Sequence, residues 1–205
     1  MFRVRAGTSF IAIALPGRES AHRDPCLTTV HDMAAFVERQ IDRLDLNDIV
    51  LFGHSLGALV AYEAARRLER TATTTLRKLV VSGCASPTAP SSLRLSRLPD
   101  DVDFLNAVGE LGGLSGEAGL DPSIVCYVLP ILRADIAAAD AYVYEPGRVR
   151  SPLLVLGGDN DPLVPRSSLE AWSDVAGAEC AVQVMTGGHF FIFEHVDRIL
   201  RLLRS

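Results

Sequence analysis

The sequence lacks the features that mark several large classes of protein. Its 20 lysines and arginines are outnumbered by 25 aspartates and glutamates, and the net charge of −5 argues against a surface for nucleic acid or anionic membranes. No apolar run reaches the length of a membrane span, and the apolar stretch at 10–15 is too short for a secretory signal. We therefore expect a cytoplasmic protein that binds neither nucleic acid nor membrane.

Cysteine is scarce, and no two cysteines form a C-x-x-C pair. We interpret the four as reduced thiols packed as small apolar residues, rather than as disulfides or metal ligands. A chain of 205 residues with 48% hydrophobic content suits one domain and can bury a core without disulfides or a structural metal ion. We expect a single domain over residues 1–205, a monomer by default, that needs no metal and no cofactor. The cysteines are Cys26, Cys84, Cys126 and Cys180.

What is present is a Gly-His-Ser-Leu-Gly pentapeptide at 53–57 in a revealing context. The apolar run Ile49–Phe52 before it reads as a buried strand, and Ala58–Arg70 after it reads as a helix. Strand, sharp turn and helix are the setting of a nucleophile elbow, in which both glycines remove side chains that would clash. Ser55 would then stand above the sheet edge as the nucleophile. The Leu56 N–H would point to where an oxyanion forms.

The rest of the chain alternates strands and helices, which predicts an α/β fold with a parallel sheet covered on both faces. Asp32 is a candidate cap for the first helix. Predicted strands cover 9–15, 49–52, 76–82, 153–156 and 181–185, and predicted helices cover 33–44, 58–70, 167–175 and 194–203.

The alternation stops between about residues 86 and 146. A Pro- and Ser-rich stretch at 86–92 opens this region, and no strand pattern follows until residue 153. Helical patterns near 100–111, 121–132 and 134–142 indicate a helical insertion between two strands. Such an insertion can cover an active site as a lid, or it can be extra packing without a gating role.

Three residues complete a catalytic arrangement in chain order. A serine nucleophile needs a histidine base, and the base needs an acid that holds its tautomer. Ser55, Asp161 and His189 each follow a predicted strand, in the order serine, acid, histidine that this fold uses. Asp161 is preferred because it lies further out on its turn. Asp159 is the alternative acid, or it caps the turn.

The other histidines fit no catalytic position. His54 lies inside the pentapeptide, and we expect its side chain to pack beside the serine. We expect His22, His31 and His195 at the surface or at helix ends.

Five stretches together resemble the type II thioesterases that accompany polyketide synthases and nonribosomal peptide synthetases, within the α/β-hydrolase superfamily. The resemblance runs through nearly the whole chain. The matching stretches are Leu-Pro-Gly-Arg-Glu at 15–19, Phe-Gly-His-Ser-Leu-Gly-Ala at 52–58, Pro-Ile-Leu-Arg-Ala-Asp at 130–135, Gly-Gly-Asp-Asn-Asp-Pro at 157–162 and Gly-Gly-His-Phe-Phe at 187–191.

The resemblance implies an α/β-hydrolase fold and a hydrolase that removes acyl or aminoacyl groups from the phosphopantetheine arm of carrier proteins. It assigns Ser55, Asp161 and His189 as nucleophile, acid and base. It implies acyl or peptidyl carrier protein domains as partners, with the phosphopantetheine carried by the substrate. For Arg133 and Asp135 we expect structural ion pairs, with each other or with a neighbour.

The front of the chain departs from this family. Family members begin with a further strand and a Gly-rich loop that supplies the second oxyanion N–H, whereas only 1–8 precede the first predicted strand here, with Gly7 their lone glycine. The family's sheet order places the missing strand between those at 9–15 and 49–52. Its absence would leave backbone groups unpaired, each costing about 1–3 kcal/mol, or would make those two strands pair directly.

Three explanations are consistent with this departure. The start is misassigned or the chain is a fragment, the sheet has closed up with a rebuilt oxyanion hole, or the protein is an inactive relative. The function hypotheses are accordingly an editing thioesterase, a non-catalytic module that binds carrier proteins, and a small-ester carboxylesterase.

Overall fold

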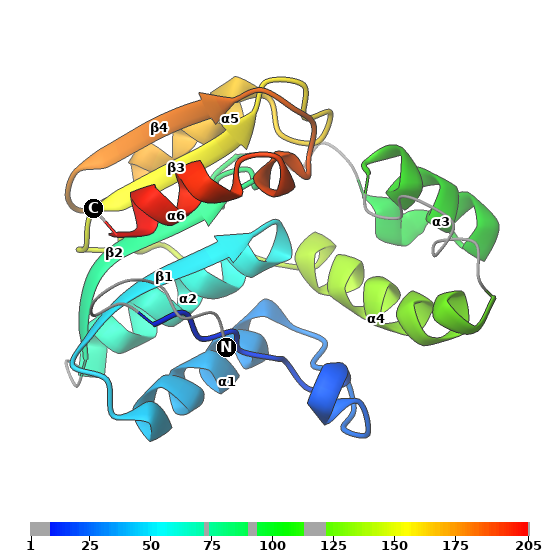
Figure 1. Ribbon diagram of the computed structural model, residues 1–205, viewed down its shortest axis with the longest axis horizontal. Coiled ribbons are helices and arrows are strands. Elements are labelled where there is room, and N and C mark those ends of the chain that lie inside the picture. The colour runs from blue at the N-terminus through cyan, green and yellow to red at the C-terminus, as the bar shows by residue number, and fades with distance from the viewer. Residues whose placement is uncertain (1–8, 72–73, 90–93, 113–121, 205) are drawn as a thin grey trace.

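Four parallel strands form one sheet in the order β1-β2-β3-β4 in the computed structural model, which describes residues 9–71, 74–89, 94–112 and 122–204. The arrowheads of β3 and β4 point toward the side of the molecule where α3 and α4 lie (Figure 1). The parallel sheet confirms the predicted fold class. The strands are β1 (Asp48–His54), β2 (Thr75–Ser82), β3 (Leu153–Gly158) and β4 (Cys180–Met185).

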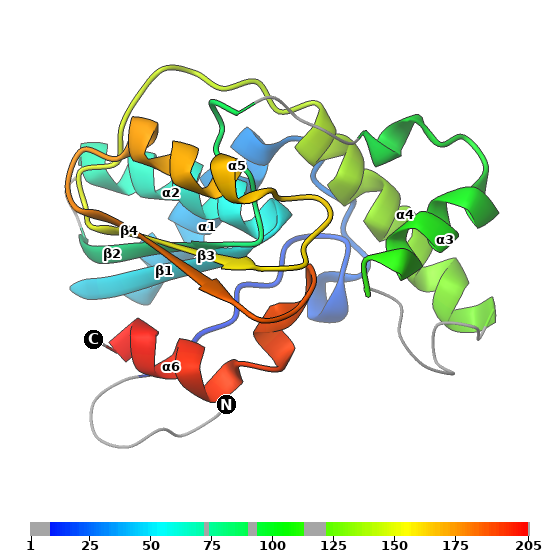
Figure 2. The same cartoon turned by 90° about the horizontal axis from the view of Figure 1, so that it is seen from above.

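Helices cover both faces of this sheet. The edge-on view shows α1, α2 and α5 on one side and α6 on the other (Figure 2). This is the arrangement that buried parallel strands require, because crossover helices lie on the faces. The helices are α1 (Val30–Leu44), α2 (Leu56–Thr71), α3 (Asp101–Glu110), α4 (Pro122–Asp140), α5 (Arg166–Glu170) and α6 (Val196–Arg204), with short 3-10 helices η1 (Glu19–Ala21), η2 (Leu95–Arg97), η4 (Ala171–Val175) and η5 (Phe191–Phe193).

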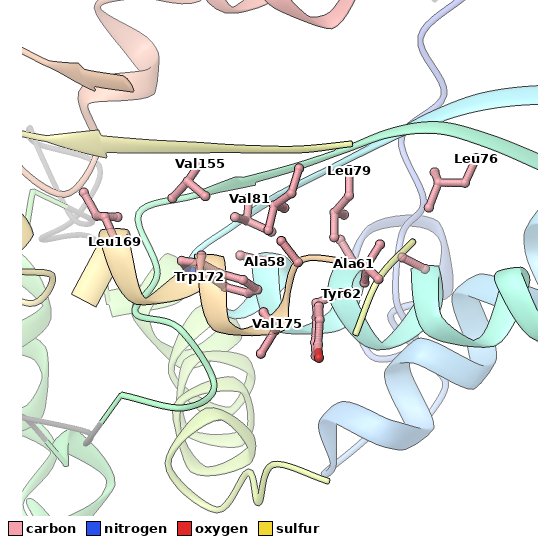
Figure 3. Packing of buried hydrophobic residues seen from close by; sticks show 14 of the residues in the cluster. Ala58, Ala61, Tyr62, Leu76, Leu79, Val81, Val155, Leu169, Trp172 and Val175 are labelled. Carbon is pink, nitrogen blue, oxygen red and sulfur yellow. The ribbon is translucent and has the colours of Figure 1, made fainter. Parts of the chain in front are cut away.

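Alternate residues of the strands enter two different cores. Leu79 and Val81 of β2 join a cluster with α2 and with Trp172, which stands edge-on to Tyr62 at 5.5 Å between ring centroids (Figure 3). Val80 belongs to a cluster on the opposite face, under α6. This alternation follows from the two-residue period of a strand and fixes which face each side chain occupies.

The first helix begins earlier than predicted, and its cap is Thr29 rather than Asp32. Val30 is the first residue of α1 and is buried in the core between α1 and α2. The Thr29 hydroxyl accepts from the Asp32 N–H at 3.1 Å and donates to the Asp32 carboxylate at 2.7 Å. Thr and Asp are both common N-cap residues. Because burial of Val30 in the core makes it the first residue of the helix, the cap position falls on Thr29.

The two helices predicted at 121–132 and 134–142 are one helix, α4. No glycine lies between 122 and 140, and the helix continues through Pro130. Within the described residues, α4 is also the one helix with the length and composition of a membrane span, so the expectation of no such run was wrong for this segment. Arg133 and Asp135 interrupt its apolar sequence, and both form ion pairs.

The predicted strand at 9–15 is not formed. Apart from a single bridge residue at Ser9, these residues have irregular backbone, and β1 pairs only with β2 among the named strands. An extended segment becomes a strand only where a neighbour supplies the ladder hydrogen bonds, and no neighbouring strand lies beside 10–15 in the described part of the chain. Direct pairing of residues 10–15 with β1, one of the expected outcomes, therefore does not occur.

A buried carboxylate ties the segment after α4 to the core. The Glu63 carboxylate of α2 accepts hydrogen bonds from the Tyr142 hydroxyl at 2.6 Å and from the Arg66 guanidinium at 2.9 Å. Glu63 is only 4% exposed. Burial, and then the hydrogen bond to Glu63, raise the pKa of the Tyr142 hydroxyl. The chain between β2 and β3 is therefore fixed to α2 where it returns to the sheet.

Candidate active site

Ser55 occupies a strained turn between β1 and α2. Its φ of +54° lies in the left-handed region, which residues other than glycine rarely adopt. The Ser55 N–H donates to the Ser82 carbonyl at 2.8 Å, which extends the β1–β2 ladder by one step. Strain at such a position persists only where the surroundings over-determine it, and here the ladder and the start of α2 do so.

Only one of the two elbow glycines is sterically required. A Cβ on Gly53 would lie 1.9 Å from the Gly57 carbonyl oxygen, which no real structure tolerates. A Cβ on Gly57 would meet nothing within 4 Å. The predicted clash is therefore confirmed for Gly53 and wrong for Gly57. At Gly57 it is the backbone carbonyl that lies close to Gly53, and a side chain there would have room.

Leu56 is the first residue of α2. The N–H groups of the first helical turn have no intrahelical acceptor, and the helix dipole favours negative charge beside them. The Leu56 N–H therefore lies next to Ser55 without an acceptor in its own helix, and its role as oxyanion donor stays a prediction. The predicted absence of a second oxyanion N–H concerns residues 1–8, which lie outside the described residues.

The structure brings Ser55, Asp161 and His189 together from the carboxyl ends of β1, β3 and β4. The Ser55 hydroxyl lies 3.1 Å from Nε2 of His189, and Nδ1 of His189 lies 2.8 Å from the Asp161 carboxylate. Because a carboxylate only accepts, Nδ1 carries the hydrogen, and Nε2 of the neutral ring is left to accept from the Ser55 hydroxyl. The His189 and Asp161 side chains are 4% and 0% exposed. The three groups can therefore pass a proton from serine to imidazole.

The two candidate acids have separate contacts. Asp161 approaches His189 with one oxygen and accepts from the Leu163 N–H at 2.9 Å with the other. Asp159 is exposed and accepts from the Gly187 N–H at 2.9 Å, so it joins the loop after β3 to the loop after β4. Asp159 therefore braces the loop that carries His189, which is a contact between two loops and not the predicted cap of its own turn.

His54 packs beside His189, with 5.1 Å between the ring centroids, whereas the sequence suggests packing beside the serine. Burial, and secondarily the proximity of His189, lower the pKa of the His54 imidazole to about 4, while Asp161 opposes the shift. His54 is therefore neutral at pH 7. The remaining histidines lie at helix ends: His22 is exposed just after η1, His31 lies in the first turn of α1, and His195 is half-buried just before α6.

The helical segment between β2 and β3 reaches the site at Phe190. A Cβ on Gly112, just after α3, would lie 3.7 Å from the Phe190 ring, and that ring stands edge-on to His189 at 5.1 Å. A separate apolar cluster around Phe104 holds α3 against α4. Gly112 therefore lies next to the Phe190 ring that packs on His189, and α3 and α4 pack against each other.

Arg133 and Asp135 form ion pairs, though not with each other. Arg133 pairs with Asp101 at 2.7 Å and lies over the Phe104 ring at 4.0 Å. Asp135 pairs with Arg18 from the loop before η1. Both pairs stabilise the placement of α4, which agrees with the structural role expected from the sequence.

Within the described residues, no three His, Cys, Asp or Glu side chains gather so as to hold a metal ion. All four cysteines are free thiols, and burial raises the pKa of the Cys84 thiol to about 12, which keeps it protonated and unreactive.

The sequence did not predict one contact at the site. Ser82 ends β2 and touches both Ser55 and His54, and this contact depends on the register of β1 against β2, which no local pattern encodes.

The chain is similar to known thioesterases throughout its length. The thioesterase domain family matches residues 3–205. The chain is 33% identical to the probable cadicidin biosynthesis thioesterase of Streptomyces griseus over 96% of its own length and 54% of the relative. It is also 33% identical to the thioesterase PikA5 of Streptomyces venezuelae over 89% of its own length and 65% of that protein. The chain thus spans about half to two thirds of these relatives.

A solved structure shares the fold. The type II thioesterase BorB from the borrelidin biosynthetic cluster superposes with a TM-score of 0.85 at 31% identity. The match covers 94% of this chain and 79% of BorB. The arrangement of sheet and helices described above is therefore that of a type II thioesterase.

Proposed function

The chain belongs to the thioesterase domain family, and on that premise we propose that it is a serine thioester hydrolase with Ser55, His189 and Asp161 as its catalytic residues. The observation that carries the proposal is the pair of hydrogen-bond distances, 3.1 Å from Ser55 to His189 and 2.8 Å from His189 to Asp161. This is the geometry that a nucleophile, its base and the orienting acid need.

The reaction proceeds in two steps. The Ser55 oxygen attacks the thioester carbonyl while Nε2 of His189 takes its proton, and the resulting oxyanion faces the Leu56 N–H. His189 then gives that proton to the departing thiol, which leaves an acyl-serine ester. A water molecule attacks this ester while His189 takes a proton from it, and His189 returns the proton to Ser55 as the free acid leaves.

We further propose that the thioester is an acyl or aminoacyl group on the phosphopantetheine arm of a carrier protein, so that the enzyme edits a polyketide or peptide assembly line. The support is the similarity to proteins named as biosynthesis thioesterases, together with the position of Gly112, just after α3, beside Phe190. In this proposal the helical segment between β2 and β3 shapes the acyl pocket as a lid, and the substrate brings the phosphopantetheine with it.

The test is hydrolysis of acyl-pantetheine thioesters and of the matched oxygen esters. Ser55→Ala should lose at least about 10³-fold in kcat/KM. Ser173→Ala, an exposed serine of η4, is the control and should match the wild type. Equal rates in wild type and Ser55→Ala would refute the proposal, and faster cleavage of oxygen esters would indicate a carboxylesterase.

A serine-directed fluorophosphonate separates the enzyme from a binding module. Labelling at Ser55 supports the enzyme. A folded wild-type protein that binds carrier protein but neither takes up the probe nor hydrolyses thioesters would instead be a non-catalytic module.

A further inference from the structure

Ser82 makes two contacts with the elbow, one through its backbone and one through its side chain. It is the last residue of β2, 1% exposed, and in register with His54 of β1. Its carbonyl accepts from the Ser55 N–H at 2.8 Å, and its hydroxyl lies 3.0 Å from Nδ1 of His54. A substitution at this position removes the second contact and leaves the first.

The hydroxyl of Ser82 is the one hydrogen-bond partner of the His54 ring within the described residues. The other ring nitrogen, Nε2, is buried and has no partner there. A Cβ on Gly83 would lie 2.5 Å from the ring, so the backbone of the next residue also lies close to it. A ring with one directional contact takes its orientation from that contact.

The His54 ring also packs against His189. Their centroids are 5.1 Å apart, and the Phe190 ring lies 5.6 Å from His54. Because burial keeps His54 neutral at pH 7, it supports the His189 ring without repelling the positive charge that His189 would acquire. Within the described residues, the His54 side chain forms no hydrogen bond with Ser55, Asp161 or His189.

We propose that Ser82 is a positioning residue, whose hydroxyl fixes the orientation of His54 and thereby holds His189 in line between Asp161 and Ser55. The proposal rests on the proposed hydrolase function. Its physical basis is that proton transfer between Ser55 and His189 tolerates little displacement, and that a supporting side chain must be locked by its own contacts.

A double-mutant cycle with Ser82→Ala and His54→Phe tests this chain of contacts. Phenylalanine keeps an aromatic ring against His189 but offers no nitrogen to Ser82. Each single variant should lower kcat about tenfold with KM nearly unchanged, since one buried hydrogen bond is lost and the base is misaligned. The double variant should be no slower than the singles, because both changes break the same contact.

Ser86→Ala is the matched control. Ser86 is 2% exposed and its hydroxyl lies 2.9 Å from that of Thr88, so this variant also loses a buried serine hydroxyl, but not one at His54. It should retain the wild-type kcat. Should Ser82→Ala not fold, Ser82→Cys keeps the volume with a weaker hydrogen bond and should fall between wild type and His54→Phe.

The outcomes separate this inference from the proposed function. A kcat for Ser82→Ala within twofold of the wild type, or an equal loss in the His54→Phe background, overturns the inference and leaves the hydrolase intact. If the wild type hydrolyses neither esters nor thioesters, the proposed function fails first. Imidazole ¹⁵N NMR then decides: unchanged His189 signals in Ser82→Ala overturn the positioning role, and shifted signals support it.

Discussion

Arg18 and Asp135 form a bidentate ion pair although they lie 117 positions apart in the sequence. The two guanidinium nitrogens donate to the two carboxylate oxygens at 2.7 and 2.8 Å, and the side chains are 20% and 19% exposed. The neighbouring Glu19 N–H donates to the Tyr127 hydroxyl at 3.0 Å. Ala138 is the one buried residue of α4, so apolar burial contributes little to its position. These polar contacts therefore provide much of the attachment of α4 to the loop before η1.

We predict that Asp135→Asn loosens α4 without unfolding the protein. The change removes a partly buried charge pair and leaves Arg18 without its carboxylate, which should raise the local opening equilibrium roughly tenfold. Hydrogen exchange of peptides from α4 should accelerate accordingly, while that of β2 and β3 stays slow. Glu170→Gln breaks an exposed pair with Arg166 in α5 and is the control. Unchanged exchange in α4 of Asp135→Asn would contradict this prediction.

Gly53→Ala and Gly57→Ala should have opposite outcomes. An added methyl at Gly53 would lie 1.9 Å from a backbone oxygen, so the strand and helix would have to separate. We expect this variant to be insoluble or destabilised by several kcal/mol, as overpacking against backbone costs more than about 1–3 kcal/mol. Gly57→Ala has open space and lies in α2, where alanine is favoured over glycine by about 1 kcal/mol. Chemical denaturation of both variants checks this pair, and equal midpoints would refute it.

Asp161→Asn and Asp159→Asn distinguish the two acids that the sequence offers. The Asp161→Asn variant would present an amide to Nδ1 of His189 and favour the wrong tautomer, so kcat should fall by about 10³–10⁴. The Asp159→Asn variant still offers an oxygen to the Gly187 N–H. Its kcat should stay within about tenfold of the wild type, because the substitution only weakens one hydrogen bond. Steady-state kinetics on one acyl thioester compare them. A larger loss in Asp159→Asn than in Asp161→Asn would exchange their roles.

Local sequence patterns account for the parts of the molecule that depend on local chemistry. The apolar run before Ser55 and the helix after it predicted the elbow, because both neighbours follow from periodicity. The order of serine, acid and histidine placed Asp161 and His189 at strand ends, and parallel strands bring such ends to one edge of the sheet.

The remaining features depend on what lies next to a residue in space. The segment 9–15 has the composition of a strand but no strand beside it in the described part of the chain, so it stays irregular. The prediction for Gly57 failed because the clash depends on which atoms face the missing Cβ. The contact of Ser82 with His54 requires the register of β1 against β2, and the pairing of Arg18 with Asp135 requires the position of α4. None of these is encoded within a window of neighbouring residues.

The buried His54 should also make stability depend on pH. Its pKa is lowered from 6.5 to about 4 by burial first and then by His189, so the unfolded chain binds a proton at a pH where the folded protein does not. The stabilisation from a neutral His54 is therefore complete above pH 6.5 and is lost as the pH falls toward 4. The groups that face the ring are His189, which adds to the shift, and Asp161, which opposes it.

We predict that His54 alone lowers the free energy of unfolding of the wild type by about 2 kcal/mol between pH 7 and pH 5. The figure follows because each pH unit between the unfolded and folded pKa values of this group changes that free energy by about 1.4 kcal/mol. His54→Gln removes the titrating ring, so its urea-unfolding free energy should change less over the same interval, whatever its value at pH 7. His22→Gln removes an exposed histidine and should keep the wild-type slope. Parallel curves for the wild type and His54→Gln would mean that the ring is solvated well enough to be protonated in the folded protein.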